Sequence, residues 1–458
     1  MLEYQAIIIG TGQAGPALAR RLAAAGWQIA ITERKLFGGT CHNTGCTPTK
    51  TLIASAYAAH VARRAADYGV NIGGRVSVDM KAVKARKDAV VGPTPNGIER
   101  SLKALRGCTV YEGHARFVGP NEVKVGDAVL KADKIFIDVG GRALVPPIPG
   151  LDQIPYLTNS SMMEVDFLPP HLIVLGGSYI GLEFAQAYRR FGSEVTVIEL
   201  ASRLISREDA DVSQAVADFL KEEGVDIRVD TKVVRVEKQG SDIAVAFESG
   251  GKESQVIGSH LLLAIGRRPN TDDLGLDAAG VATDQHGYIQ VDDQLRTNVP
   301  GIWALGDCNG RGAFTHTAWN DYEIVAANIL DNDPRRVTDR VPAYALFTDP
   351  PLGRAGMTEA QLRQSGRPAL VATMAMQDVA RAREKGETRG FMKVLVDAQT
   401  KQILGASLLG TAGDEVIHCI IDVMYANAPY TLLQRAMHVH PTVSEWVPTM
   451  LEDLIPLR

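Results

Sequence analysis

The clearest pattern along the chain is a short apolar run that ends in a glycine-rich turn and continues into helical periodicity. Residues 3–9, which read Glu-Tyr-Gln-Ala-Ile-Ile-Ile, predict a buried parallel strand. Residues 171–175, which read His-Leu-Ile-Val-Leu, predict a second strand of the same kind. Because each run is followed at once by a turn and by apolar residues at helical spacing, the chain contains two copies of a strand, turn and helix unit.

The turn in each copy has the spacing of a dinucleotide-binding fingerprint. Its first glycine permits a tight turn, its second lets a pyrophosphate approach the backbone, and its third lets the helix pack on the strand. In the first copy these positions are Gly10, Gly12 and Gly15. In the second copy they are Gly176, Ser178 and Gly181, where Ser178 adds a small side chain near the phosphates.

Both units end their second strand at an acid. Strands predicted over residues 28–32 and 194–198 lead to Glu33 and Glu199, each 23 positions after the first glycine of its unit. A carboxylate at this point accepts hydrogen bonds from an adenosine ribose, so the chain is predicted to hold two dinucleotide sites. Glu199 would repel a 2′-phosphate and favours NADH, while Arg203 and Arg207 just beyond it keep NADPH as the alternative.

Two cysteines with four residues between them follow closely on the first unit and indicate redox chemistry. Cys41 and Cys46 lie in a run that ends at Lys50, and no Cys or His cluster follows at zinc-ligand spacing. Cys46 precedes a helical segment with Pro48 in its first turn, where free N–H groups and the helix dipole favour a thiolate. Lys50 in that same turn opposes the helix dipole, a poor choice for stability alone.

Composition and charge narrow the function classes. A chain of 458 residues predicts about three domains, and 45% hydrophobic with 22% charged residues is the composition of a globular enzyme rather than a disordered chain. A net charge of -5 without a basic run gives no reason to expect nucleic acid or a membrane surface. The first strand starts near Met1 and no apolar stretch spans a bilayer, so we expect neither signal peptide nor transmembrane helix. Five cysteines, an odd number, favour a reducing cytoplasm.

With these motifs, residues 1–458 resemble the flavoprotein disulfide reductases, the class I pyridine nucleotide-disulfide oxidoreductases that include lipoamide dehydrogenase, glutathione reductase and mercuric reductase. The resemblance implies an α/β fold with two Rossmann-like dinucleotide-binding domains, for FAD and NAD(P), and a C-terminal α+β dimerisation domain. The implied parts are 1–150 for FAD, 151–270 for NAD(P), 271–340 completing the FAD domain, and 341–458 for the interface. We expect amphipathic helices over 53–68 and 77–106.

The resemblance also implies roles for the residues around the dithiol. Cys41 matches the interchange thiol that attacks the substrate, and Cys46 matches the thiol against the flavin. Lys50 would lie beside the flavin ring, paired with Glu183, where its charge would stabilise reduced flavin. His440 matches the base that takes the proton from the interchange thiol of the other subunit, oriented by Glu445, so the chain is expected to be a homodimer.

The cofactor residues follow the same resemblance. Tyr179 matches a tyrosine that covers the flavin until the nicotinamide arrives, Thr315 is a candidate helix N-cap facing the flavin, and His316 is expected to be structural. The expected FAD-binding residues are Gly10, Gly12, Gly15, Glu33, Gly39, Thr40, Lys50, Gly140, Gly306, Asp307 and Thr315. The expected NAD(P)-binding residues are Gly176, Ser178, Tyr179, Gly181, Glu199 and Gly266.

The substrate stays open between branches of the family. Residues 381–383 and 387–391 resemble mercuric reductase, but residues 454–458 lack the vicinal cysteines that would hand Hg(II) inward. We therefore favour NAD(P)H-dependent reduction of a disulfide or another oxidised-sulfur substrate that is glutathione-, lipoamide- or hypothiocyanous-acid-like. Residues 48–50 and 350–352 resemble the reactive-chlorine-resistance branch. A metal-ion reductase, a lipoamide dehydrogenase component of a multienzyme complex, and a redox-dependent binding module remain alternatives. No metal site is expected.

Overall fold

A computed structural model describes residues 1–457 and divides them among several sheets. The first sheet has seven strands in the order β3-β2-β1-β6-β5-β4, with β16 on the far side of β6. Its strands are β1 (Leu2–Ile9), β2 (Ile29–Glu33), β3 (Cys108–Glu112), β4 (Ala115–Gly119), β5 (Glu122–Val125), β6 (Ala128–Ile137) and β16 (Ile302–Ala304). Since β1 pairs in parallel with both β2 and β6, the parallel strand predicted at residues 3–9 is confirmed.

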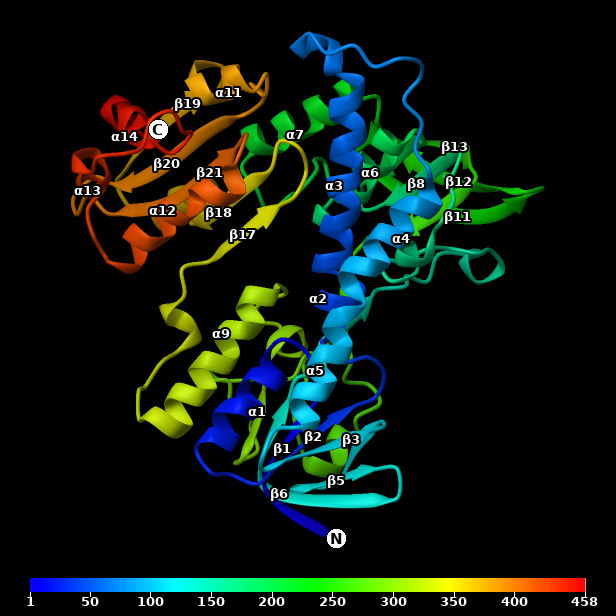
Figure 1. Cartoon of the computed structure of the whole chain (residues 1–458), viewed down its shortest axis with the longest axis vertical. Coiled ribbons are helices and arrows are strands. Elements are labelled where there is room, and N and C mark those ends of the chain that lie inside the picture. Colours follow the sequence, from blue (N-terminus) through cyan, green and yellow to red (C-terminus); the bar gives the residue numbers. More distant parts are fainter. Residues whose placement is uncertain (458) are drawn as a thin grey trace.

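The first sheet is covered by helices that come from distant parts of the chain. Helix α1 (Ala14–Ala24) packs against α9 (Thr315–Ala326), so a segment beyond residue 300 returns to the N-terminal sheet. Both helices lie beside β1 in the lower part of Figure 1. Strand β16 joins the same sheet by pairing with β6, as expected if a later segment completes the first domain.

The second sheet repeats the design of the first in a smaller form. It has the order β10-β9-β8-β14, and every pair is parallel. Its elements are β8 (His171–Leu175), α6 (Tyr179–Phe191), β9 (Glu194–Ile198), α7 (Ala210–Glu222), β10 (Asp226–Arg228) and β14 (His260–Leu263). A three-stranded antiparallel sheet, β11 (Thr231–Gln239), β12 (Asp242–Ser249) and β13 (Lys252–Gly258), packs beside it. The strands predicted at 171–175 and 194–198 are confirmed.

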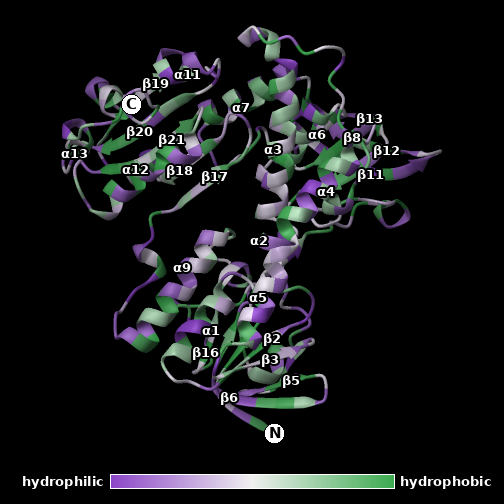
Figure 2. Cartoon of the chain, in the orientation of Figure 1, coloured by the Kyte–Doolittle hydropathy of each residue, from purple (hydrophilic) through white to green (hydrophobic). Residues whose placement is uncertain are grey.

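The C-terminal part is a six-stranded antiparallel sheet with helices, at the upper left of Figure 1. Its strands are β17 (Ala343–Leu346), β18 (Leu352–Gly356), β19 (Ala369–Ala375), β20 (Phe391–Asp397), β21 (Ile403–Leu409) and β22 (Ile455–Pro456). Its helices are α10 (Glu359–Ser365), α11 (Ala380–Glu384), α12 (Gly413–Tyr425), α13 (Thr431–Arg435) and α14 (Trp446–Met450). Figure 2 shows apolar residues along many of the strands, whereas the outer part of the β11–β13 sheet is hydrophilic. The predicted fold class is confirmed, whereas the four domain boundaries stay predictions.

A long central helix connects these parts. Helix α3 (Cys46–Arg63) packs against α4 (Met80–Val91) and α6, and it follows the short helix α2 (Gly39–Asn43). The expected helix over 53–68 therefore begins earlier, at Cys46, and gives way to a 3-10 turn after Arg63. The expected helical segment 77–106 divides into α4 and α5 (Pro93–Lys103), because proline tolerates only the first turn of a helix.

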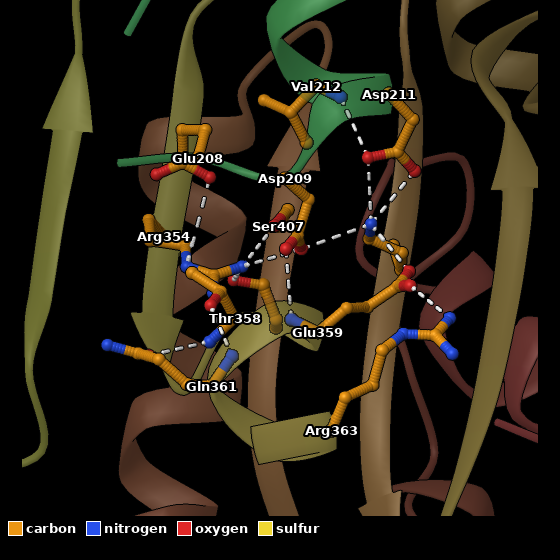
Figure 3. A network of polar contacts seen from close by, with 12 residues as sticks. Glu208, Asp209, Asp211, Val212, Arg354, Thr358, Glu359, Gln361, Arg363 and Ser407 are labelled. Carbon is orange, nitrogen blue, oxygen red and sulfur yellow. Dashed lines mark hydrogen bonds and ion pairs between the residues drawn. The ribbon is translucent and has the colours of Figure 1, made fainter. Parts of the chain in front are cut away.

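Buried charges attach the C-terminal sheet to the second domain. Arg354 on β18 and Lys393 on β20 are both only 2% exposed. The Lys393 Nζ lies 2.8 Å from a carboxylate oxygen of Asp211 and 2.8 Å from one of Glu359, and the Arg354 Nε lies 3.9 Å from Glu208 (Figure 3). The contacts of Lys393 with Asp211 and of Arg354 with Glu208 therefore link the C-terminal sheet to the segment around the start of α7.

Residues 1–457 contain no helix that is long and apolar enough to cross a membrane. Within the same residues, no group of three or more His, Cys, Asp or Glu side chains is arranged to hold a metal ion.

Candidate active site

A cleft of about 1670 Å³ lies between the first sheet, α3 and the C-terminal part. Its walls include all the residues predicted for FAD except Gly15. Gly15 instead lies against the strand, because a Cβ there would come 2.4 Å from the carbonyl oxygen of Gly10. This is the helix packing that the third glycine of the fingerprint provides.

The residues of the first unit fit a dinucleotide. No side chain caps the start of α1, and Glu33 turns back to the glycine loop, where its Oε2 accepts the Thr11 hydroxyl at 2.6 Å. A Cβ on Gly39 would lie 3.0 Å from the Cα of Gly12, so the two loops approach too closely for larger residues. Because pockets for small ligands measure about 300–1,000 Å³, the cleft has room for FAD and for a further substrate.

The second unit repeats this geometry with Glu199. Its carboxylate accepts the N–H of Gly177 at 2.6 Å and that of Ala201 at 2.7 Å. The Arg203 guanidinium turns back into its own loop and donates to the carbonyl oxygens of Ser206 and Glu208, each at 3.1 Å. Arg203 is therefore already engaged, which weakens the alternative of a 2′-phosphate partner.

The dithiol lies at the inner wall of the cleft. Cys41 is half-buried on α2, and Cys46 is exposed toward the cleft at the first position of α3; both are free thiols. The Cys46 Sγ lies 3.1 Å from the Thr315 hydroxyl. The pKa of Cys46 is lowered to about 6, mainly by a hydrogen bond with the Cys41 thiol. The Thr315 hydroxyl and the Lys50 charge lower it further, and burial acts in the opposite direction. Cys46 and burial raise the pKa of the Cys41 thiol.

An ion pair closes the side of the cleft behind the dithiol. Lys50, one turn after Cys46 on α3, has its Nζ 2.7 Å from the Oε2 of Glu183 on α6. Glu183 is 5% exposed, and its other oxygen accepts the N–H of Phe347 at 3.1 Å. The Lys50 ammonium also lies 4.5 Å from the centre of the Phe347 ring. The pairing of Lys50 with Glu183 is confirmed, and the Lys50 charge faces the cleft.

The start of α9 corrects one prediction. Thr315 is the first residue of the helix, and the N-cap is Phe314. The Thr315 hydroxyl turns to Cys46, while the Thr317 hydroxyl accepts the N–H of Phe314 at 3.1 Å. The cap prediction failed because Thr315 already lies inside the helix, while the Thr317 hydroxyl bonds the backbone of the N-cap residue Phe314. The His316 Nε2 donates to the carbonyl oxygen of Ala343 at 2.7 Å, and burial lowers the pKa of this imidazole.

An aromatic cluster lines this cleft next to the second dinucleotide loop. The Tyr179 ring lies 5.5 Å from that of Phe314 and 5.9 Å from that of Tyr344, both edge-on. Phe314 and Tyr344 stack at 5.5 Å, and the Tyr344 hydroxyl hydrogen-bonds to Glu208. Sequence reasoning found Tyr179 but missed the other three, because they meet only through the packing of three separate segments.

His440 and Glu445 form a pair that does not line the cleft. The His440 Nδ1 lies 3.0 Å from a Glu445 carboxylate oxygen, and the imidazole is 76% exposed. Nearby, Met437 is 99% and Val439 is 77% exposed. The pair is therefore preformed on the surface of the chain, with the imidazole largely exposed.

Two dinucleotide loops, a dithiol at a helix start and an ion pair beside it define the class of an FAD-dependent disulfide oxidoreductase. The chain belongs to the family described as pyridine nucleotide-disulphide oxidoreductase, whose pattern matches residues 4–321, while residues 342–451 match the dimerisation domain of that family. As predicted, the chain is an enzyme that uses FAD and NAD(P)H, and the dimerisation domain supports a homodimer.

Similar proteins come from several branches. The chain is 38% identical over 466 residues to the probable pyridine nucleotide-disulfide oxidoreductase RclA of Escherichia coli, covering 100% of both chains. It is 35% identical to the mercuric reductase of Streptomyces lividans, covering 96% of this chain and 94% of the relative. It is 31% identical to the dihydrolipoyl dehydrogenase of Chlamydia muridarum, covering 98% and 96%.

Solved structures agree with this fold. The HOCl-induced flavoprotein disulfide reductase RclA from Escherichia coli superimposes with a TM-score of 0.90 at 37% identity, covering 98% of this chain and 100% of that one. A Cu(II) complex of the same enzyme gives a TM-score of 0.90 and covers 99% of both chains.

Proposed function

We propose that this enzyme is an NADH-dependent reductase of small oxidised-sulfur substrates, with the Cys41–Cys46 dithiol as the electron donor. The observation that carries the proposal is Cys46, whose lowered pKa and position on the cleft suit a thiolate facing FAD. FAD, when bound, would take a hydride from NADH and pass the electron pair to the disulfide of Cys41 and Cys46.

The two cysteines would then divide the chemistry. The Cys41 sulfur attacks an oxidised sulfur of the substrate and forms a mixed disulfide, which releases the reduced leaving group. Cys46 attacks Cys41 in turn, which frees the second reduced product and restores the intramolecular disulfide. Lys50 holds a positive charge at the flavin side of this pair, and Glu183 fixes its position.

Proton transfer would require a second subunit. Cys46 and burial raise the pKa of the Cys41 thiol, so Cys41 needs a base to become a nucleophile. The His440–Glu445 pair suits this task, because the carboxylate holds Nδ1 and leaves Nε2 to take the proton. Since His440 is exposed and outside the cleft of its own chain, we propose that it serves the dithiol of the partner subunit.

The choice of NADH rests on the second loop. Glu199 would lie beside the adenosine ribose, and its two carboxylate oxygens each accept a backbone N–H. The Arg203 guanidinium instead donates to carbonyl oxygens of its own loop. A carboxylate there repels a 2′-phosphate. Gly266 and Tyr179 stay predicted contacts of the nicotinamide dinucleotide, and a reducing cytoplasm stays the expected compartment.

The substrate class is supported by the surroundings of the dithiol. His42, Thr44 and Thr47 give the approach to the sulfurs a polar character, which suits small polar oxidants of the hypothiocyanous-acid or glutathione type. The solved relative is described as HOCl-induced, which points in the same direction. The test is steady-state oxidation of NADH with oxidised glutathione, lipoamide, hypothiocyanite and Hg(II) in turn. Turnover of a sulfur substrate supports the proposal, and turnover of Hg(II) alone contradicts it.

Metal-ion reduction is the second candidate, because relatives include mercuric reductases and a structure described as a Cu(II) complex. A pair of thiolates is a good ligand for soft ions such as Hg(II) and Cu(I). Activity with Cu(II) or Hg(II) that exceeds activity with every sulfur substrate would favour this function. A role in a multienzyme complex would instead show as co-purification with acyltransferase subunits.

A further inference from the structure

A buried acid at the FAD loop has no part in the chemistry above. Asp138, the residue directly after β6, is only 5% exposed and lines the cleft. Its Oδ2 accepts the N–H of Gly15, in the first turn of α1, at 2.7 Å. A carboxyl group therefore stands at the helix start where the pyrophosphate of a dinucleotide binds.

The carboxyl group is held between two turns that are predicted to contact FAD. A Cβ on Gly12 would lie 3.0 Å from its Oδ2, and a Cβ on Gly306 would lie 3.3 Å from its Oδ1. Both turns therefore need glycine where they approach the carboxyl group, and Asp138 lies between them on the wall of the cleft.

The second dinucleotide loop shows that the fold itself does not need an acid here. Ala264 takes the same backbone place, since its N–H donates to Leu175 at 2.8 Å as that of Asp138 donates to Ile9 at 2.8 Å. A Cβ on Gly176 would meet the Ala264 carbonyl oxygen at 2.4 Å, and one on Gly10 would meet that of Asp138 at 2.2 Å. The acid is an addition to the first loop alone.

The charges that face Asp138 are mostly of its own sign. Asp307 from the turn after β16, Asp321 from α9 and Glu33 from β2 all disfavour its ionised form. The nearby cations are already paired, Arg267 with Asp307 at 3.4 Å and Arg340 with Asp321. Burial is the largest cause that raises the pKa of Asp138 well above its ordinary value, and the Gly15 N–H only partly opposes it. The buried Cys308 thiol adds no charge, because burial raises its pKa as well.

We propose that Asp138 is a positioning residue that holds FAD when the Asp138 carboxyl group is protonated. Retention of FAD is then linked to one proton bound by Asp138. The protonated acid accepts the Gly15 N–H through Oδ2 and presents an O–H at Oδ1. The ionised acid would place a negative charge beside the pyrophosphate, repel the phosphates and compete with them for the positive end of the α1 dipole. The proposal rests on FAD binding at the first loop and not on the identity of the substrate.

Linkage gives the sign and the size of the effect. Because bound FAD adds negative charge, the pKa of Asp138 is higher in the holoenzyme than in the FAD-free enzyme. The FAD-bound form then holds more protons, so retention is strongest at low pH and falls as pH rises between the two pKa values. Over that interval the FAD dissociation constant rises about tenfold per pH unit.

The test measures how much flavin the holoenzyme releases between about pH 6 and pH 9. Free FAD is separated by ultrafiltration and quantified by its fluorescence. Asp138→Asn keeps the shape of the side chain and is neutral at every pH. We therefore expect this variant to retain FAD equally across the range, without the rise of the dissociation constant of about tenfold per pH unit expected for the wild type. Asp133→Asn makes the same change at an exposed position of β6 and should follow the wild type.

Two outcomes would overturn the proposal. The first is a pH dependence in Asp138→Asn equal to that of the wild type. The second is loss of FAD from Asp138→Asn even at about pH 6, which would mean that the acid is needed as an anion. If the asparagine variant does not fold, Asp138→Ala reproduces the second loop, and its flavin release must then be independent of pH.

Discussion

The two dinucleotide loops of this enzyme have nearly the same backbone but different surroundings. In both, the first glycine packs on the residue just after a neighbouring parallel strand, β6 in the first loop and β14 in the second. In both, an acid accepts the backbone N–H of the residue after that glycine. The first loop opens onto Cys46, Lys50 and the buried Asp138, whereas the second has Ala264 in place of the acid and opens onto Tyr179. We propose that one design serves two tasks, with the first loop keeping FAD beside the dithiol and the second exchanging the nicotinamide dinucleotide.

The largest effect should come from the dithiol that only the first loop meets. Cys41→Ser removes the attacking sulfur, so disulfide reduction by NADH should fall by about 10³-fold or more. Cys46 and Lys50 stay in place, and the long-wavelength absorbance of the Cys46 thiolate with flavin should therefore persist. Cys419→Ser, at a half-buried cysteine outside the cleft, is the matched control. Normal turnover in Cys41→Ser would refute the assignment of roles.

Removing the charge beside the flavin should have the next largest effect. Lys50→Met leaves Glu183 buried without its cation and removes the positive charge that faces the cleft. We expect the rate of flavin reduction by NADH, measured by stopped-flow absorbance, to fall about 10²-fold. Lys81→Met on the exposed face of α4 should leave the rate unchanged. An unchanged rate in Lys50→Met would show that the pair only supports the packing of α3 on α6.

The second loop can be tested through its choice of nucleotide. Glu199→Ala removes the ribose partner and the repulsion of a 2′-phosphate, so the ratio of kcat/KM for NADH over NADPH should fall about tenfold. The control is Glu194→Ala, an exposed acid on the same strand. A ratio that does not change would place nucleotide selection outside this loop.

The smallest effect is expected when the acid of the first loop is placed at the matching position of the second loop. Ala264→Asp gives the second loop the acid of the first, and its charge would oppose NADH at the start of α6. We expect KM for NADH to rise about fivefold between pH 6 and pH 8, the equivalent of roughly 1 kcal/mol. Ala264→Asn is the neutral match and should show no such change. Equal pH profiles for the two variants would mean that an acid at this position does not act through its charge.

Much of this fold could be predicted from local pattern. The parallel strands of both loops, their glycines and their terminal acids follow from residues close together in sequence, and these predictions are confirmed. The pairing of Lys50 with Glu183 came from family resemblance, because 133 positions separate them and no local pattern connects them. The helical segment over 77–106 was placed correctly but not its interruption at Pro93, although Gly92, Pro93 and Pro95 are poor helix formers.

What sequence reasoning missed depends on contacts between distant segments. Asp138 stands one residue beyond an apolar strand, where an acid is usually a surface turn former, and only the return of α1 and the turn after β16 buries it. Arg354 and Lys393 lie on strands of the C-terminal sheet, yet each also approaches an acid that precedes or begins α7, Glu208 and Asp211 respectively. Thr315 was assigned to a cap, but its hydroxyl faces Cys46 across 269 positions of sequence.

The most direct test is an anaerobic titration of the purified enzyme with NADH, repeated at several pH values and followed by absorbance. The account predicts a long-wavelength band when one pair of electrons has entered each subunit, and this band should be present above about pH 6 and be lost as the pH falls through about 6, because the pKa of Cys46 is lowered to about 6. Full reduction of the flavin with no such band at any pH would contradict the claim that Cys46 meets FAD as a thiolate.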